Sequence, residues 1–132
     1  FENLSGQKCY SPAKTYYQNK LALLMLSLYM REHWKGIKIQ AIRVTNVKVD
    51  MNRYNHLNTF MKNLYKIKSR FSISPEEIAK VYTALSTEDG YDGFLYDEKC
   101  REVKANRSAY EEEEQAKLYS LLEQLTFSRD NL

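Results

Sequence analysis

The chain has 132 residues, which is enough for one domain with a hydrophobic core. A hydrophobic content of 43% and a charged fraction of 28% exclude a disordered protein, and four Gly with two Pro favour long regular elements over an all-β fold. No signal sequence opens the chain at Phe1, and the longest mostly apolar stretch, residues 21–30, is about half the length of a membrane span. We therefore expect a helix-rich cytoplasmic protein, or a part of a larger one, with no membrane span.

The two cysteines, Cys9 and Cys100, are too few for a disulfide framework. Two free thiols are favoured over one long-range disulfide, which stays open as an alternative. The net charge of +3 is unevenly spread, because residues 35–70 contain many Lys and Arg but a single acid, Asp50. Such a basic segment would suit the phosphates of a nucleotide or a nucleic acid. A solvated face is the simpler interpretation, and we expect no nucleic-acid partner.

The first long element is a helix predicted over residues 12–35. Ser11-Pro12 is typical of an N-cap followed by proline at the first helical position, and Gly36 follows the expected end. Apolar side chains surround nearly the whole helix between residues 21 and 30, which predicts burial on more than one side. Residues 37–44 are β-branched and alternate in polarity, which predicts a strand.

The remaining elements are predicted from caps and turns. Residues 45–52 are expected to form a loop, and residues 52–86 a helical segment whose second helix starts at a capping box, Ser74-Pro75-Glu76-Glu77. A strand is expected over residues 93–97, a short extended piece over 101–103, and a C-terminal helix over 108–126 that starts at a second capping box, Ser108 to Glu111.

The order of these elements predicts an α/β fold. The two strands are separated by mainly helical sequence, which implies a crossover connection and parallel pairing. A parallel sheet needs both faces covered and several neighbouring strands, so two or three strands make an incomplete sheet. The sequence therefore predicts a piece of a larger fold, in one domain over residues 1–132.

Tyr16 and Lys20 lie one helical turn apart in the predicted first helix, on the same face. A lysine ammonium beside a phenol favours the phenolate, which suits a tyrosine that works as a general acid or base. Tyr10 and Lys14 have the same spacing, but they straddle Pro12 at the helix entry and should not share a face. Cysteine and histidine spacing predicts no metal site.

The segment from Tyr10 to Ala22, YSPAKTYYQNKLA, resembles the active-site helix of short-chain dehydrogenases/reductases, particularly the branch of retinol dehydrogenases and the WW-domain oxidoreductase. There the pattern is approximately Tyr-Ser-x-x-x-x-Tyr-x-Gln-Ser-Lys-Leu-Ala. The resemblance continues, in the same order and spacing, at residues 37–41, 73–79, 93–97 and 100–103, and in the closing helix from residue 109. It covers nearly the whole chain.

The resemblance implies the C-terminal half of a doubly wound, Rossmann-type parallel sheet, and an NAD or NADP cofactor. It implies that Tyr16 transfers a proton to or from a carbonyl or alcohol substrate, and that Lys20 assists Tyr16 and holds the nicotinamide ribose. The family's Pro-Gly turn falls at Val44-Thr45, and its carboxamide-contacting threonine falls near Val49; neither is kept. Thr45 and Asn46 are the candidates to substitute as cofactor-binding residues.

The substrate side is expected in residues 50–73, where Tyr54 and His56 are candidate pocket residues for a small molecule. Packing of both side chains against the sheet is an equal alternative. The glycine-rich phosphate loop has no counterpart among the four glycines, and the family's catalytic serine is expected upstream of Phe1.

The functional expectation is therefore the C-terminal part of an NAD(P)-dependent short-chain oxidoreductase, inactive alone. Its partner would be the missing N-terminal half, or a second subunit on the exposed apolar helix. The alternative is a non-catalytic binding or dimerisation module descended from that family.

Overall fold

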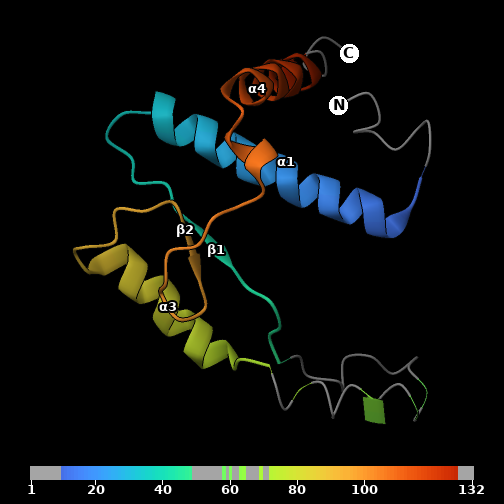
Figure 1. Cartoon of the computed structure of the whole chain (residues 1–132), viewed down its shortest axis with the longest axis vertical. Helices are drawn as coiled ribbons and strands as arrows, with labels where there is room; N and C mark the ends of the chain where they lie inside the picture. Colours follow the sequence, from blue (N-terminus) through green and yellow to red (C-terminus); the bar gives the residue numbers. More distant parts are fainter. Residues whose placement is uncertain are drawn as a thin grey trace. The chain divides into compact units, whose positions relative to one another are not determined.

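The computed structural model describes residues 10–48, residues 58, 60, 63, 64 and 69, and residues 72–127. In chain order the described elements are α1 (Pro12–His33), β1 (Ala41–Arg43), α3 (Pro75–Thr87), β2 (Leu95–Asp97), the 3-10 helix η2 (Arg107–Tyr110) and α4 (Glu112–Phe127), drawn in Figure 1. β1 and β2 form a small parallel sheet, so the protein is α/β and helix-rich, as the sequence predicted.

The chain divides into two compact units. The first contains Phe1–Ala41 and Lys104–Leu132, and the second contains Ile42–Val103. α1, η2 and α4 therefore belong to the first unit, while α3, β2 and all but the first residue of β1 belong to the second. None of the described helices is long and apolar enough to cross a membrane.

α1 begins at Pro12, where the sequence predicted a helix start, with Ser11 as the N-cap residue. The Ser11 side chain makes no capping hydrogen bond, so the start depends on proline, which presets φ and has no N–H to leave unpaired. The helix ends at His33, two residues before the predicted end at residue 35. Gly36 follows with φ +78°, a left-handed conformation that glycine adopts readily.

In the first unit, α1 packs on α4 and η2, and Figure 1 shows α4 lying beside it. Met25 and Leu28 are the buried residues of α1. The Tyr29 ring stacks on the Tyr119 ring of α4 with centroids 4.5 Å apart. Residues 21–30 are otherwise buried or half-buried, whereas Leu23 in the middle of α1 is 57% exposed, so the described residues cover only part of the predicted buried surface of this helix.

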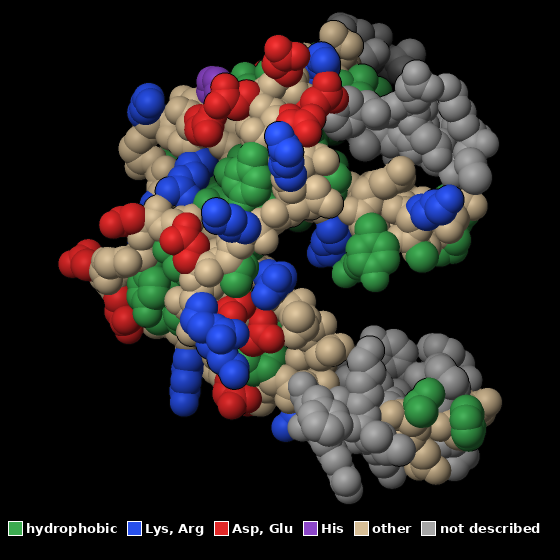
Figure 2. All heavy atoms as spheres, in the orientation of Figure 1, with side chains coloured by type: hydrophobic (Ala, Val, Ile, Leu, Met, Phe, Trp, Pro, Cys, Tyr) green, Lys and Arg blue, Asp and Glu red, His purple; other side chains and the backbone are tan. Residues whose placement is uncertain are grey.

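The predicted capping box at Ser108 is not used to start the last helix. Asn106 caps the 3-10 helix η2 instead, since its side-chain oxygen accepts a hydrogen bond from the backbone N–H of Ser108 (3.1 Å). The Tyr110 hydroxyl accepts a further bond from the N–H of Ala105 (3.0 Å), which closes this turn. α4 therefore begins only at Glu112. Its first-turn acids face the positive end of the helix dipole, and acidic side chains gather there in Figure 2.

In the second unit, β2 is the more buried strand. All three of its residues are buried, whereas Arg43 of β1 is exposed. The far side of β2 is also paired, because Tyr96 forms an antiparallel bridge with Glu102 in the extended piece predicted over 101–103. β1 includes only Ala41–Arg43 and is therefore shorter than the predicted strand 37–44. It has three residues, the same number as its partner β2.

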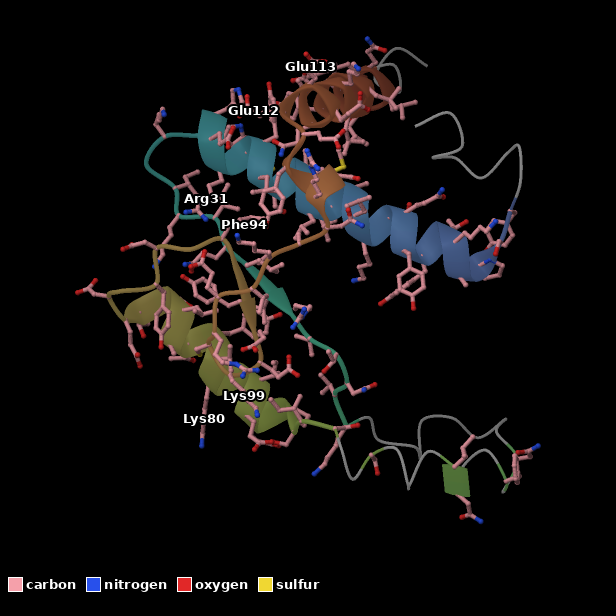
Figure 3. All side chains as sticks on the ribbon, viewed as in Figure 1. Arg31, Lys80, Phe94, Lys99, Glu112 and Glu113 are labelled. Carbon is pink, nitrogen blue, oxygen red and sulfur yellow. The ribbon has the colours of Figure 1, made fainter. Side chains whose placement is uncertain are left out.

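α3 covers this sheet and is the second helix predicted in segment 52–86. Its capping box forms as predicted: the Ser74 Oγ accepts from the Glu77 N–H (3.2 Å), and the Glu77 carboxylate accepts from the Ser74 N–H (2.9 Å). The hydrogen bond from the Ser74 backbone N–H to the carboxylate is the main cause that lowers the pKa of Glu77. Val81 and Leu85 pack against Tyr96 of β2, while Lys80 projects away from the strand (Figure 3).

Several sequence predictions lie outside the described residues. They include Cys9, the turn position Val49, and all but isolated residues of the helix expected over 53–70. Cys100 is described and is a free cysteine, half-buried against the Val81–Leu85–Tyr96 cluster.

Gly93 is required by close packing, so Gly93→Ala should lower stability by about 1–3 kcal/mol. A Cβ atom there would lie 2.8 Å from the hydroxyl of Tyr96 and 2.5 Å from the Glu102 carboxylate. Glu102 is exposed and can move, but Tyr96 is buried and its hydroxyl accepts a bond from the Gly93 N–H (2.6 Å). Denaturant unfolding followed by circular dichroism measures the loss. Adding Glu102→Ala to this variant should restore only part of the lost stability. An unchanged denaturant midpoint in Gly93→Ala would contradict the packing argument.

Candidate functional site

Tyr16 and Lys20 lie on one face of α1, close to each other. The Lys20 ammonium nitrogen is 5.6 Å from the centroid of the Tyr16 ring, within the range of a cation–π contact. The spacing of four residues produces this contact, because successive helical turns stack side chains i and i+4. The pair is thus formed by α1 itself and needs no other element to bring it together.

The Tyr16–Lys20 face is the side of α1 opposite to the packed side. Met25 follows Tyr16 by about two and a half turns at 3.6 residues per turn, so it points the other way. Tyr16 begins a stripe spaced by alternating steps of four and three residues along the helix: Tyr16, Lys20, Leu23, Ser27 and Met30. In the described structure Tyr16, Lys20 and Leu23 of this stripe are exposed, Tyr16 and Leu23 each at 57%, while Ser27 and Met30 are half-buried.

Two further tyrosines lie near the start of α1. The Tyr17 ring meets the Tyr16 ring edge to face, with centroids 5.4 Å apart and planes at 78°. Tyr10 precedes the helix, so it shares no helical face with Lys14, as the position of Pro12 predicted. Of Tyr10, Tyr16 and Tyr17, Tyr16 is therefore the one whose ring contacts a lysine ammonium, that of Lys20.

The Tyr16–Lys20 pair is open to solvent in the first unit. The described residues thus place this tyrosine–lysine pair on a helix surface, and the described part of the first unit does not enclose it.

Thr45 and Asn46 lie in the second unit and follow β1 after one intervening residue, Val44. The Thr45 hydroxyl donates a hydrogen bond to Glu98 Oε1 (2.8 Å), and the carbonyl of Asn46 accepts from the N–H of Ile73 (2.9 Å). The predicted pocket residues Tyr54 and His56 lie outside the described residues.

Glu98 is the residue in contact with Thr45 that sequence reasoning missed. Glu98 directly follows β2, and Thr45 lies two residues after the end of β1. The carboxyl ends of parallel strands meet at one edge of a sheet, so both residues lie at that edge. The predicted strand ends put both residues at one edge of the sheet, but only the register of the strands brings them into contact. In the part of the chain that the structure describes, Glu98 Oε2 is buried and has no hydrogen-bond partner.

Asp97 is the most strongly perturbed acid among the described residues. Its side chain is buried and accepts bonds from the Arg101 Nε (2.8 Å) and from the backbone N–H groups of Lys99 (2.9 Å) and Arg101 (3.0 Å). The Arg101 side-chain hydrogen bond is the main cause that lowers the pKa of Asp97 to about 2. All of these donors belong to the turn that follows β2, so the role of Asp97 is to stabilise this turn.

The described glycines do not form a phosphate loop. Gly36 and Gly90 adopt positive φ after the ends of α1 and α3, and Gly93 packs under Tyr96. Tyr16 and Lys20 suit the nicotinamide end of a cofactor, as a hydroxyl and an ammonium on one face. The described chain offers no cradle for the pyrophosphate, and no group of three or more metal-ligating side chains occurs within it.

Comparisons of the chain with protein-family models, with curated protein sequences and with solved structures found no match.

Proposed function

We propose that the chain is the C-terminal part of a cytoplasmic, NAD(P)-dependent short-chain oxidoreductase acting on a carbonyl or alcohol substrate. The observation that carries the proposal is the Tyr16–Lys20 pair on the uncovered face of α1. The pair lies within the segment that resembles the family's active-site helix. Tyr16 and Lys20 are both exposed in the described structure, as residues that meet a substrate must be.

The two residues have complementary roles in the proposed reaction. In the reducing direction Tyr16 donates its hydroxyl proton to the substrate oxygen, and the Lys20 ammonium stabilises the phenolate that remains. A proton from solvent then restores the hydroxyl. The nicotinamide cofactor, when bound, supplies the hydride that the substrate carbon receives. Oxidation of the alcohol reverses each of these transfers.

Lys20 would also position the cofactor, because its ammonium has three N–H donors. Donors not engaged with Tyr16 are available to ribose hydroxyls on the exposed face of α1. The pyrophosphate requires a glycine-rich loop at a helix N-terminus, which the described chain lacks. The proposed partner is therefore a cofactor-binding N-terminal half, without which the chain is inactive.

The sheet is compatible with this proposal. β1 and β2 are parallel neighbours connected through α3, which is the connection expected at one side of a doubly wound sheet. Two strands are too few for such a sheet to be complete, so the proposal assigns the missing strands to the N-terminal half.

Tyr16→Phe tests the proposed role, and should lower kcat by roughly 10²–10⁴-fold in the protein that includes the N-terminal half. The ring and the Lys20 contact remain, so only the transferable proton is lost. Tyr17→Phe is the matched control, since Tyr17 is a neighbouring exposed tyrosine on a different helical face, and it should retain activity. Equal activity in wild type and Tyr16→Phe would contradict the role. The 132-residue chain alone should show no thermal shift with NADH or NADPH.

The second candidate function is a non-catalytic binding or dimerisation module. The specific observation in its favour is the exposed Leu23, with Tyr16 on the same stripe. If the stripe binds a second copy, Leu23→Asp should abolish a dimer seen by analytical ultracentrifugation, whereas Tyr17→Phe should leave it intact. A monomeric wild-type chain would remove the dimerisation candidate.

A further inference from the structure

The segment after β1 is held from two sides. On one side, the Thr45 hydroxyl donates to Glu98 Oε1 (2.8 Å), across 53 positions of sequence. On the other side, Ile73 donates its N–H to the Asn46 carbonyl (2.9 Å) and accepts from the Lys48 N–H (2.9 Å). Val47 and Ile73 form the corresponding parallel bridge. All of these contacts lie within the second unit.

The position of this segment is one where ligands bind in α/β proteins. Open parallel sheets take their ligands outside the carboxyl ends of the strands, and residues 44–48 and Glu98 follow the carboxyl ends of β1 and β2. A loop that contacts a ligand works best when its own side chains and backbone are fixed by surrounding contacts. Segment 44–48 contains neither proline nor glycine, and its backbone is bonded to Ile73 through Asn46 and Lys48.

We propose that Thr45 and Glu98 form a clip that positions segment 44–48, and that Thr45 acts as a positioning residue. A threonine hydroxyl has one proton to donate, and that of Thr45 is given to Glu98. Toward a ligand the hydroxyl therefore offers only its lone pairs. A ligand group that meets Thr45 must be an N–H or O–H donor, such as an amide or a sugar hydroxyl. The binding of a ligand at this segment, and its identity as a nicotinamide nucleotide, rest on the proposed function; the clip itself does not.

The state of Glu98 supports a role in holding the loop. In the described part of the chain its Oε2 is buried and has no partner, which costs stability for a charged oxygen. Its Oε1 makes a hydrogen bond that joins the two loops. Glu98→Gln keeps an acceptor at that position and removes the charge, so it should preserve the clip.

Amide hydrogen exchange on the whole chain, followed by NMR, tests the clip without any ligand. Thr45→Val keeps the shape of the side chain and removes the donor. We expect the amides of Lys48 and Ile73 to exchange roughly five- to tenfold faster in this variant, because one hydrogen bond holds the segment less tightly. The amides of Asp97 and Val103 bond within the β2 hairpin of the same unit and should be unchanged. Thr45→Ser, which keeps the donor, should restore wild-type exchange.

Glu98→Ala should give the same pattern as Thr45→Val, and the double variant should show no further increase, because both remove one shared bond. Unchanged exchange at Lys48 and Ile73 in Thr45→Val would overturn the proposal. So would equal acceleration at Asp97 and Val103, or additive effects in the double variant. The measurement involves neither Tyr16 nor a cofactor, so failure of the clip and failure of the proposed oxidoreductase function are distinguishable.

Discussion

Replacing Leu118 with alanine should destabilise the first unit by about 2–5 kcal/mol, the range for large-to-small changes in a packed core. Leu118 is 0% exposed, the most completely buried large side chain among the described residues. It lies on α4, the helix that packs on α1. The truncation removes apolar contacts and leaves a cavity that rigid neighbouring helices fill only in part.

Leu125→Ala is the matched control for this change. Leu125 lies on the same helix and is 55% exposed, so the same truncation should cost well under 1 kcal/mol there. Urea unfolding monitored at 222 nm compares the two variants directly. Similar losses in both would mean that the α1–α4 contact does not stabilise the unit.

Asp97→Asn should weaken the second unit, and Asp97→Ala should weaken it further, by several degrees in melting temperature or more. Asparagine keeps an oxygen for the backbone N–H groups of Lys99 and Arg101 but loses the ion pair with the Arg101 guanidinium, whose shortest contact is 2.7 Å. Alanine loses both the hydrogen bonds from these backbone N–H groups and the ion pair with Arg101. The turn also holds Cys100 at φ +55°, a conformation that non-glycine residues adopt only when neighbouring bonds enforce it.

The same aspartate predicts an acid dependence with a definite sign. Its pKa in the folded protein is about 2, below the ordinary 3.8, so the contribution of Asp97 to stability is fully present above about pH 4. It is lost as pH falls toward 2, because the unfolded chain takes up the proton first. Unfolding midpoints measured between pH 5 and pH 2 should fall less steeply in Asp97→Asn than in wild type. Asp89→Asn, at an exposed turn residue, should keep the wild-type slope.

Local signals in the sequence were sufficient for the helix starts. Proline after Ser11 and the Ser74–Glu77 box each act within one turn, so the neighbouring residues alone determine them. The parallel pairing of β1 and β2 also followed from the sequence, because helical sequence between two strands requires a crossover.

Features that depend on distant residues could not be read in advance. The length of β1 is set by its partner β2, and the choice of Asn106 over Ser108 as a cap depends on how Tyr110 folds back on Ala105. The Asp97 network forms only when the chain turns back toward Arg101. The Thr45–Glu98 bond joins residues 53 positions apart, and its discovery required the register of both strands.

For the Tyr16–Lys20 pair, one feature could be predicted from the sequence and another could not. The common face of Tyr16 and Lys20 follows from helical periodicity alone. The exposure of that face follows from the side on which α4 packs, which the nearly uniform apolar composition of residues 21–30 left undetermined.

The coding sequence upstream of Phe1 tests the central claim most directly. If the chain is the C-terminal part of a short-chain oxidoreductase, sequencing the transcript should extend the reading frame upstream into a strand, a glycine-rich turn and a helix. An initiation codon immediately before Phe1, with no such segment, would contradict the claim and favour the non-catalytic module.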